Sequence, residues 1–209
     1  MNYARLLIVS LISASLSLGA CKDKAPADDQ QAHIADVVAK GGVVDSILPI
    51  PEQLARFRQT IAERPDTLRH ASASINELVT RWTLAVASSD TVALNAMLLD
   101  RAEFAWLYYP GSKMSMPPYE APPQLLWGQM LATSEEGAQN ILKNFSVSSF
   151  KVGGVNCPSP PVTEGRNRLH EGCLVQAETA NTRAVKGAYF GTIIERDGRF
   201  KFVSYASRM

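Results

Sequence analysis

Cysteine and histidine are the side chains here best suited to nucleophilic, redox or metal chemistry, and their spacing limits what they can do. They are Cys21, Cys157, Cys173, His33, His70 and His170. No Cys-x-x-Cys or His-x-x-x-His spacing occurs, which disfavours a metal site. The sequence also lacks a phosphate-binding glycine loop, a serine-hydrolase elbow and a zinc-protease helix. We therefore expect no metal and no cofactor.

The first 21 residues have the pattern of an export signal. Arg5 precedes an apolar run, Leu6–Leu18, that is too short and too rich in serine to span a membrane well. The run ends in Leu18–Cys21 (LGAC), which resembles the lipobox of bacterial lipoproteins. The resemblance implies that residues 1–20 are a signal peptide and that Cys21 is acylated as the first mature residue. The alternative is an ordinary secretory signal that happens to contain a cysteine.

Charge limits the partners of the chain. It carries 21 basic and 20 acidic residues, and loss of Arg5 with the signal would leave equal numbers. A nucleic-acid binder needs a concentrated basic excess, and the sequence has no such run. We therefore expect no nucleic-acid partner. Membrane attachment would come from the lipid on Cys21, because several acyl chains on one cysteine hold a protein durably at a bilayer.

The mature part divides into a linker and one domain. Residues 21–50 begin with a polar stretch that lacks apolar periodicity and predict a lipidated tether, and residues 51–209 suit a single domain. In Gram-negative lipoproteins, aspartate directly after the acylated cysteine is associated with retention in the inner membrane. Lys22 stands there, which implies an outer-membrane lipoprotein facing the periplasm, with the inner membrane as the alternative.

Cys157 and Cys173 remain once Cys21 is acylated. An exported chain matures in an oxidising compartment, so this pair indicates a disulfide. Chain-entropy models give a loop of this length about 3 kcal/mol of stabilisation. Two free buried thiols or a pair of metal ligands are the alternatives.

Apolar periodicity predicts helices in the first half of the domain. Pro51 suits the first turn of one helix, and Asp66 can cap a longer helix with an apolar stripe over Leu68–Val86. Asp90 can cap a short third helix.

The spacing of apolar residues changes in the rest of the domain. The aromatic segment Asp100–Tyr109 predicts a short strand, and helical spacing returns over residues 125–145. Asp197-Gly198 is a hairpin signal, and the segment Pro158–Gly172 reads as a loop. Four strands are expected, over 147–155, 173–179, 183–195 and 200–207. Helices followed by an antiparallel meander make the fold class α+β.

This order of elements is similar to the nuclear-transport-factor-2-like (SnoaL-like) superfamily over about residues 66–207. Two stretches carry the resemblance: Trp82–Leu99, where small residues and an aspartate precede a short helix, and Tyr189–Tyr205, which looks like the last hairpin. The disulfide-bearing insertion and a proline-rich loop depart from the pattern. The resemblance implies a cone in which N-terminal helices pack on a curved antiparallel four-strand meander.

The superfamily also implies a candidate site, although its fold serves isomerases, dehydratases, cyclases, ligand binders and structural partners alike. In members like ketosteroid isomerase, a general base follows the second or third helix and faces the interior. The matching positions are Asp100 and Glu103, with Tyr108 or Tyr109 as hydrogen-bond donors by location only. A carboxylate in an apolar pocket has a raised pKa that suits a base. Asp100-Arg101 equally suits a helix end with a solvated ion pair.

Three hypotheses follow. We expect a lipid-anchored cell-envelope protein whose domain binds a small molecule or a partner protein without chemistry. An isomerase or dehydratase that uses Asp100 or Glu103 is the alternative. In the third, the domain is a scaffold that forms homodimers through its sheet face.

Overall fold

A computed structural model describes residues 32–33, 35–37, 39–41, 48–145, 151–179 and 182–206. The chain divides into two compact units, Met1–Ile47 and Leu48–Met209, each described by itself. In the first unit, residues 35–37 are helical and Lys40 Nζ donates a hydrogen bond to Asp36 Oδ2 at 2.8 Å. The signal segment, the lipobox and Cys21 lie outside the described residues.

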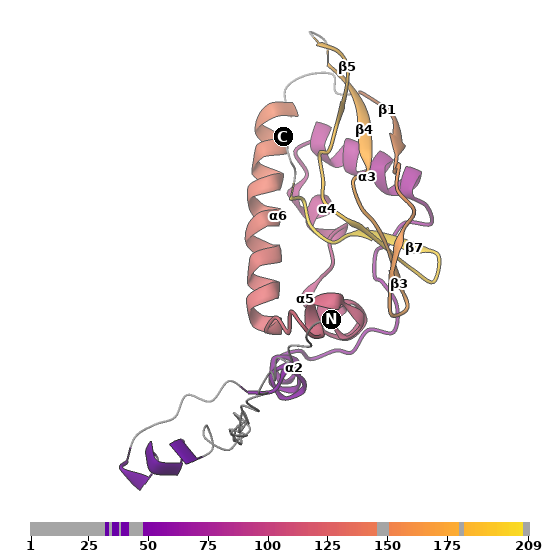
Figure 1. Cartoon of the computed structure of the whole chain (residues 1–209). Coiled ribbons are helices and arrows are strands. Elements are labelled where there is room, and N and C mark those ends of the chain that lie inside the picture. The colour runs from indigo at the N-terminus through magenta and orange to yellow at the C-terminus, as the bar shows by residue number, and fades with distance from the viewer. Residues whose placement is uncertain are drawn as a thin grey trace, which may run out of the picture. The chain divides into compact units, whose positions relative to one another are not determined.

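The second unit combines helices with antiparallel sheets and is an α+β domain (Figure 1). Its α-helices are α2 (Ile50–Gln59), α3 (Ile75–Ala87), α4 (Thr91–Ala96), α5 (Arg101–Glu103) and α6 (Pro123–Phe145). After α5 come a π-helical turn, η1 (Phe104–Tyr108), and two 3-10 turns, η2 (Tyr109–Gly111) and η3 (Lys113–Ser115). The strands are β1 (Lys151–Asn156), β2 (Val162–Glu164), β3 (Asn167–His170), β4 (Leu174–Thr179), β5 (Thr182–Gly187), β6 (Ile193–Arg196) and β7 (Arg199–Phe202).

The strands form two sheets. One has the order β1-β4-β5 and the other the order β2-β3-β6-β7, and every pairing between these strands is antiparallel. The sequence predicts four strands here. The segment Pro158–Gly172, expected as a loop, instead contains the β2–β3 hairpin, and the expected strand 183–195 is divided into β5 and β6. The β6–β7 turn is as predicted, with Asp197 and Gly198 both at positive φ.

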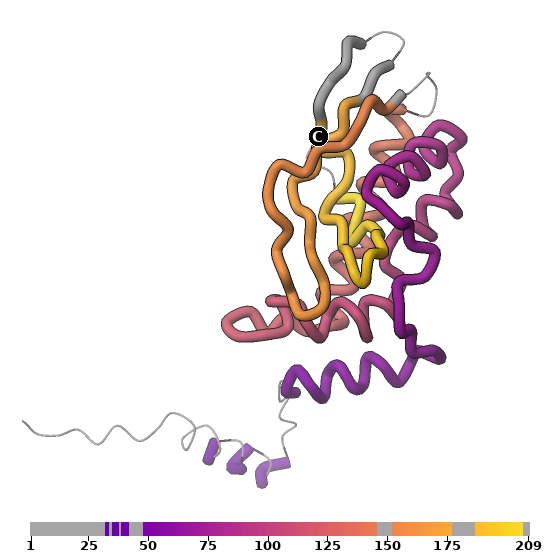
Figure 2. The backbone as a smooth tube through the Cα atoms, turned by 90° about the vertical axis from the view of Figure 1, so that its right-hand side faces the viewer, coloured from indigo at the N-terminus to yellow at the C-terminus, as the bar shows by residue number. Residues whose placement is uncertain are grey.

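Figure 2 shows the purple segment of α3 alongside the orange and yellow strands. A hydrophobic core joins α3, α4 and α6 to both sheets. Its centre is an aromatic column of Trp82, Phe190, Phe202 and Tyr205, none of which is more than 3% exposed. Ring centroids lie 5.5 Å apart for Trp82–Phe190, 4.6 Å for Phe190–Phe202 and 5.4 Å for Phe202–Tyr205. The Tyr205 hydroxyl donates to the Leu94 carbonyl at 2.8 Å. The column therefore fills the space between the helices and the sheets.

Helix α3 begins later than its apolar stripe predicts, and Asp66 is not its cap. Ser74 Oγ accepts a hydrogen bond from Glu77 N at 3.1 Å, and the Glu77 carboxylate accepts one from the backbone just before the cap. Upstream, Ser72 forms an antiparallel bridge with Phe200. Residues before Ser74 thus reach the core from a non-helical segment of bends and turns, which apolar spacing alone does not distinguish from a helix.

The aromatic segment Asp100–Tyr109 is helical, so the expected strand is wrong. Asp100 caps α5, and Phe104 of η1 meets Phe57 of α2 edge to face with 5.7 Å between centroids. Phe104 is completely buried. Burial by α2 and its neighbours, rather than strand propensity, decides the conformation here.

The π-helical turn η1 has carbonyls that side chains from other elements satisfy. Arg58 Nη2 donates to the Ala105 oxygen at 2.8 Å. Asn167 Nδ2 donates to the Leu107 oxygen at 2.8 Å, and Arg196 Nη1 donates to the same oxygen at 3.3 Å. Burial lowers the pKa of both Arg58 and Arg196. These contacts fasten η1 between α2 and the sheet of β3 and β6.

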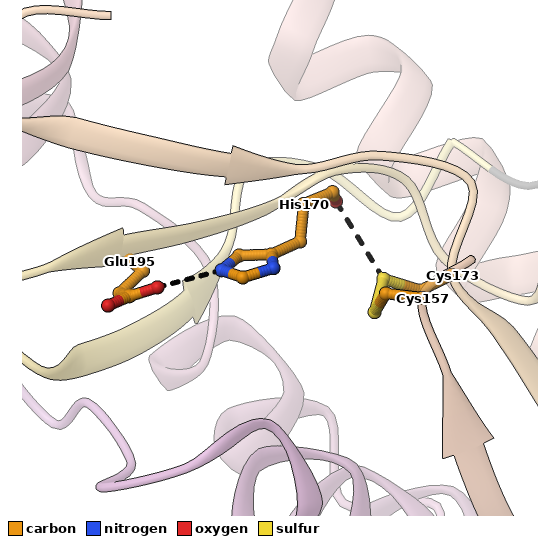
Figure 3. The surroundings of a disulfide bond; sticks show 4 residues. All are labelled: Cys157, His170, Cys173 and Glu195. Carbon is orange, nitrogen blue, oxygen red and sulfur yellow. Dashed lines mark hydrogen bonds and ion pairs between the residues drawn. A yellow bond between two sulfur atoms is a disulfide. The ribbon is translucent and has the colours of Figure 1, made fainter. Parts of the chain in front are cut away.

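Cys157 and Cys173 form a disulfide, as the sequence predicts (Figure 3). This pairing excludes the two alternatives, free thiols and metal ligands. The bond joins the end of β1 to the start of β4, close to where one sheet gives way to the other.

Cys157→Ser should lower the free energy of unfolding by about 3 kcal/mol, because the closed loop of the unfolded chain is released. Chemical denaturation of the wild type and the variant measures the difference. The variant should also expose one thiol, that of Cys173, to alkylation once the chain unfolds. Alkylation of Cys173 in the folded wild type would show that no disulfide had formed.

The stability of the domain should fall above about pH 10. Burial raises the pKa of Tyr205 well above the usual range of a tyrosine, so the unfolded chain loses this proton first and gains stability relative to the folded chain as pH rises. Tyr205→Phe should cost about 1 kcal/mol at neutral pH through the lost hydrogen bond to Leu94. It should also make the alkaline decline shallower in denaturant titrations at a series of pH values. An unchanged alkaline slope would contradict this role of the hydroxyl.

Candidate functional site

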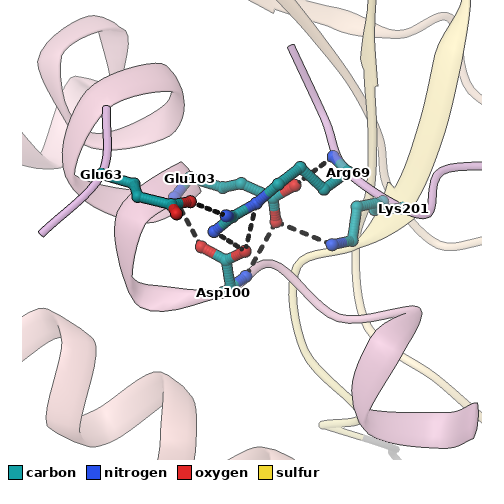
Figure 4. Close-up of polar contacts among 5 residues, drawn as sticks. All are labelled: Glu63, Arg69, Asp100, Glu103 and Lys201. Carbon is teal, nitrogen blue, oxygen red and sulfur yellow. Dashed lines mark hydrogen bonds and ion pairs between the residues drawn. The ribbon is translucent and has the colours of Figure 1, made fainter. Parts of the chain in front are cut away.

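Asp100 and Glu103, the candidate catalytic carboxylates, lie together at the start of α5 (Figure 4). Asp100 Oδ1 accepts a hydrogen bond from Glu103 N at 2.8 Å, and Glu103 Oε2 accepts one from Asp100 N at 2.9 Å. This reciprocal arrangement is a capping box, which the Asp-x-x-Glu spacing could have indicated from the sequence.

Glu103 is completely buried, and its charge is matched by a buried lysine. Lys201 of β7 has a side chain only 2% exposed, and its Nζ lies 2.7 Å from Glu103 Oε2. The backbone N–H of Arg69 donates to the other carboxylate oxygen. The Glu103 carboxylate thus joins α5, β7 and the segment before α3.

Asp100 is more accessible and pairs with Arg69. Arg69 Nη2 lies 2.6 Å from Asp100 Oδ2, and both side chains are 38% exposed. Arg69 Nη1 also contacts Glu63 at 2.9 Å. The hydrogen bond with Asp100 raises the pKa of Arg69. For Asp100, this geometry corresponds to the alternative of a helix end with an ion pair.

A general base needs a free lone pair within reach of a substrate proton. Three donors already occupy the buried Glu103 carboxylate, and Arg69 together with the α5 backbone engages Asp100. The tyrosines do not complete a site, because Tyr109 donates its hydroxyl proton to Ala121 O at 2.6 Å and Tyr108 bonds Ser112. The contacts of both carboxylates are those of a helix cap and of ion pairs that stabilise structure.

His170 takes part in a second charged cluster, beside the disulfide (Figure 3). Its Nε2 lies 2.8 Å from Glu195 Oε2, while Arg168 Nη1 contacts the other Glu195 oxygen at 2.9 Å. The Cys173 sulfur is 3.8 Å from the His170 carbonyl oxygen. Across the described part of the chain, no three histidine, cysteine or acidic side chains are placed to hold a metal ion.

Several hollows open on the surface of the domain. One, of about 410 Å³, follows the seam between α3 and β1. Another, of about 560 Å³, lies where the two sheets meet and is lined by Glu171, Gly191 and Ser204 among others. A third lies beside α2 and includes Arg101 in its lining. Neither Asp100 nor Glu103 lines any of these hollows.

Comparison with known proteins identifies no relative. No family model, curated protein or solved structure matches this chain. None of the helices in the described ranges is long and apolar enough to cross a membrane.

The sequence did not reveal Arg69 and Lys201 as partners of the carboxylates. Lys201 stands between Phe200 and Phe202, and strand alternation would place its side chain in solvent. Both faces of the β2-β3-β6-β7 sheet are covered, however, with Ile193 and Phe202 in one core cluster and Leu169 and Ile194 in another. Lys201 is buried because the sheet has no solvent face at this point.

Lys201→Met should destabilise the domain by about 3–5 kcal/mol, because it leaves the Glu103 charge buried without its partner. The double variant Glu103→Gln with Lys201→Met should lose less, since no orphan charge remains. Arg56→Met is the matched control, because Arg56 and its partner Glu52, whose charged atoms lie 2.7 Å apart, are 61% and 47% exposed, and its cost should stay below about 1 kcal/mol. Denaturant unfolding compares the three. Equal losses in the single and double variants would contradict the ion-pair account.

Proposed function

We propose that this chain is a lipid-anchored cell-envelope protein whose domain binds a partner without catalysing a reaction. The observation that carries the proposal is the aromatic column. Trp82, Phe190, Phe202 and Tyr205 occupy the space between helices and sheets, where an enzyme of the superfamily that the sequence resembles would hold its substrate. Binding then falls to the surface, which favours a macromolecular partner over an enclosed small molecule.

The envelope location rests on the N-terminal segment and the disulfide together. Leu18–Cys21 supplies the lipobox pattern, and Lys22 supports the outer membrane, with the domain in the periplasm. The Cys157–Cys173 disulfide supports an oxidising compartment. Removal of the signal at Cys21 leaves residues 21–50 as the tether and 51–209 as the anchored domain.

We propose a nuclear-transport-factor-2-like cone for the domain, and strand pairing supports it. β1 pairs with β4 while β2 pairs with β3, and β4 pairs with β5 while β3 pairs with β6. The two sheets can therefore be traced as consecutive halves of longer strands, over 151–164, 167–179 and 182–196, with β7 as a fourth. Four bent strands in sequential antiparallel order are what a curved meander requires.

The alternative of an isomerase or dehydratase has less support. It needs Asp100 or Glu103 free to take a proton, whereas both are engaged by capping and ion-pair contacts. A binding domain needs neither carboxylate free.

Cys21→Ala should abolish lipidation, because acylation requires the thiol. Expression of the full chain in a Gram-negative bacterium with labelled palmitate measures this, and the labelled wild type should fractionate with the outer membrane. Lys22→Ser is the matched control, since it keeps Leu18–Cys21 intact and should still be labelled. Persistence of the label in Cys21→Ala would refute the lipid anchor.

A further inference from the structure

Strand β1 is an edge strand with an open side. It stands at the end of the order β1-β4-β5, and among the described residues it pairs with β4 alone. An edge strand presents unpaired backbone N–H and C=O groups that can template another strand. The middle of β1 is Val152-Gly153-Gly154-Val155, so two side chains are missing where a second backbone would approach.

The open side of β1 faces a groove whose other wall is the flank of α3. Asn76, Thr80 and Leu84 lie along this exposed flank, and Leu84 is 65% exposed. The Thr80 hydroxyl donates back to the Asn76 carbonyl at 2.8 Å. None of the side chains lining the groove is ionisable, although a fifth of the chain is charged. The groove therefore suits an uncharged, extended segment.

The four middle residues of β1, Val152-Gly153-Gly154-Val155, read the same in both directions, and the two valines also face the same side of the sheet. Pairing with β4 shifts register between Val152 and Gly154, so the strand holds one extra residue there. Val152 stands opposite Ala177 and Val155 opposite Val175, positions two apart on β4 that share a face. Both valines consequently pack toward the same core.

We propose that β1 pairs antiparallel with β1 of a second copy of this chain, so that two three-stranded sheets join into one of six strands. This inference rests on the proposed function, whose partner it names. In the pairing, Val152 of each copy lies opposite Val155 of the other, and Gly153 opposite Gly154. The added strand lies along the α3–β1 groove and covers Leu84.

A second copy fits better than a charged or unrelated segment for two reasons. The groove has no ionisable lining, so two identical grooves meet without like-charge repulsion. In a two-fold dimer, the same surface of each copy must also fit itself. Val152–Val155 meets this requirement, because its sequence reads the same in both directions and both valines point to the same side of the sheet. In such a dimer both β1 edges are paired, so neither can bind a third copy through this strand.

Sedimentation velocity of the mature chain carrying Cys21→Ser, which has no acyl groups to drive association, tests the proposal over a wide concentration range. The protein should form dimers. Gly153→Lys should raise the dimer dissociation constant about tenfold or more, because it places like charges close to the two-fold axis. The fold has room for this side chain, since a Cβ at Gly153 meets nothing nearer than the Gln176 side chain at 3.8 Å.

Gly128→Lys on α6 is the matched control, because a Cβ there also meets open space and Leu125 beside it offers a rival apolar surface. It should dimerise like the parent. Leu84→Ser should weaken the dimer, whereas Val92→Ser, at another exposed apolar position, should not. Thermal melts check that each variant is folded.

A parent protein that stays monomeric at every concentration overturns the proposal. So does a dimer that Gly128→Lys disrupts and Gly153→Lys leaves intact, which would place the interface on α6. Loss of the dimer in Gln176→Lys, with full affinity in Leu84→Ser, would place it on the exposed sheet face and also overturns edge pairing. Palmitate labelling of Cys21 does not depend on any of these outcomes. The proposal of a lipid anchor and the proposal of a dimer can therefore be refuted independently of each other.

Discussion

The buried ion pair between Glu103 and Lys201 is the constraint on which the arrangement of the domain depends. It joins α5 to β7, and the same carboxylate binds the backbone of Arg69 ahead of α3. A fully buried charge needs its partner, because burying a charge without one costs far more folding free energy than an imperfect apolar contact does. The position of α5, and with it η1 and the docking of α2, is therefore tied to the register of β7.

The centre of the β2-β3-β6-β7 sheet has no face exposed to solvent. Aromatic side chains cover one side of β6 and β7, while η1 and its neighbours cover the other, where Asn167 and Arg196 both donate to the Leu107 carbonyl of η1. In the described part of the domain, neither candidate carboxylate lines any of the hollows found on its surface. Under the proposed function, the hollow at the seam of α3 with β1 and the hollow at the junction of the sheets are the surfaces that could receive a partner.

Local sequence signals predicted the features that depend on neighbouring residues. Asp90 caps α4, Asp197 and Gly198 form the β6–β7 turn, and Cys157 pairs with Cys173. The α+β class also followed, because the change from helical to strand periodicity is a property of the chain itself. The strand expected over Asp100–Tyr109 was wrong, since aromatic residues carry strand propensity only until tertiary packing decides otherwise.

The sequence by itself determined where charge, cysteine and turn residues stand, and the superfamily it resembles implied Asp100 or Glu103 as a general base. The capping-box spacing of these two residues was also present in the sequence. Only the tertiary structure decided what that pair does. Arg69 and Lys201 lie 31 and 98 residues away from the acidic residues they neutralise, and no local pattern links them. Burial on both faces of a sheet is a property of the assembled layers, so a lysine that alternation would expose becomes the partner of a buried carboxylate.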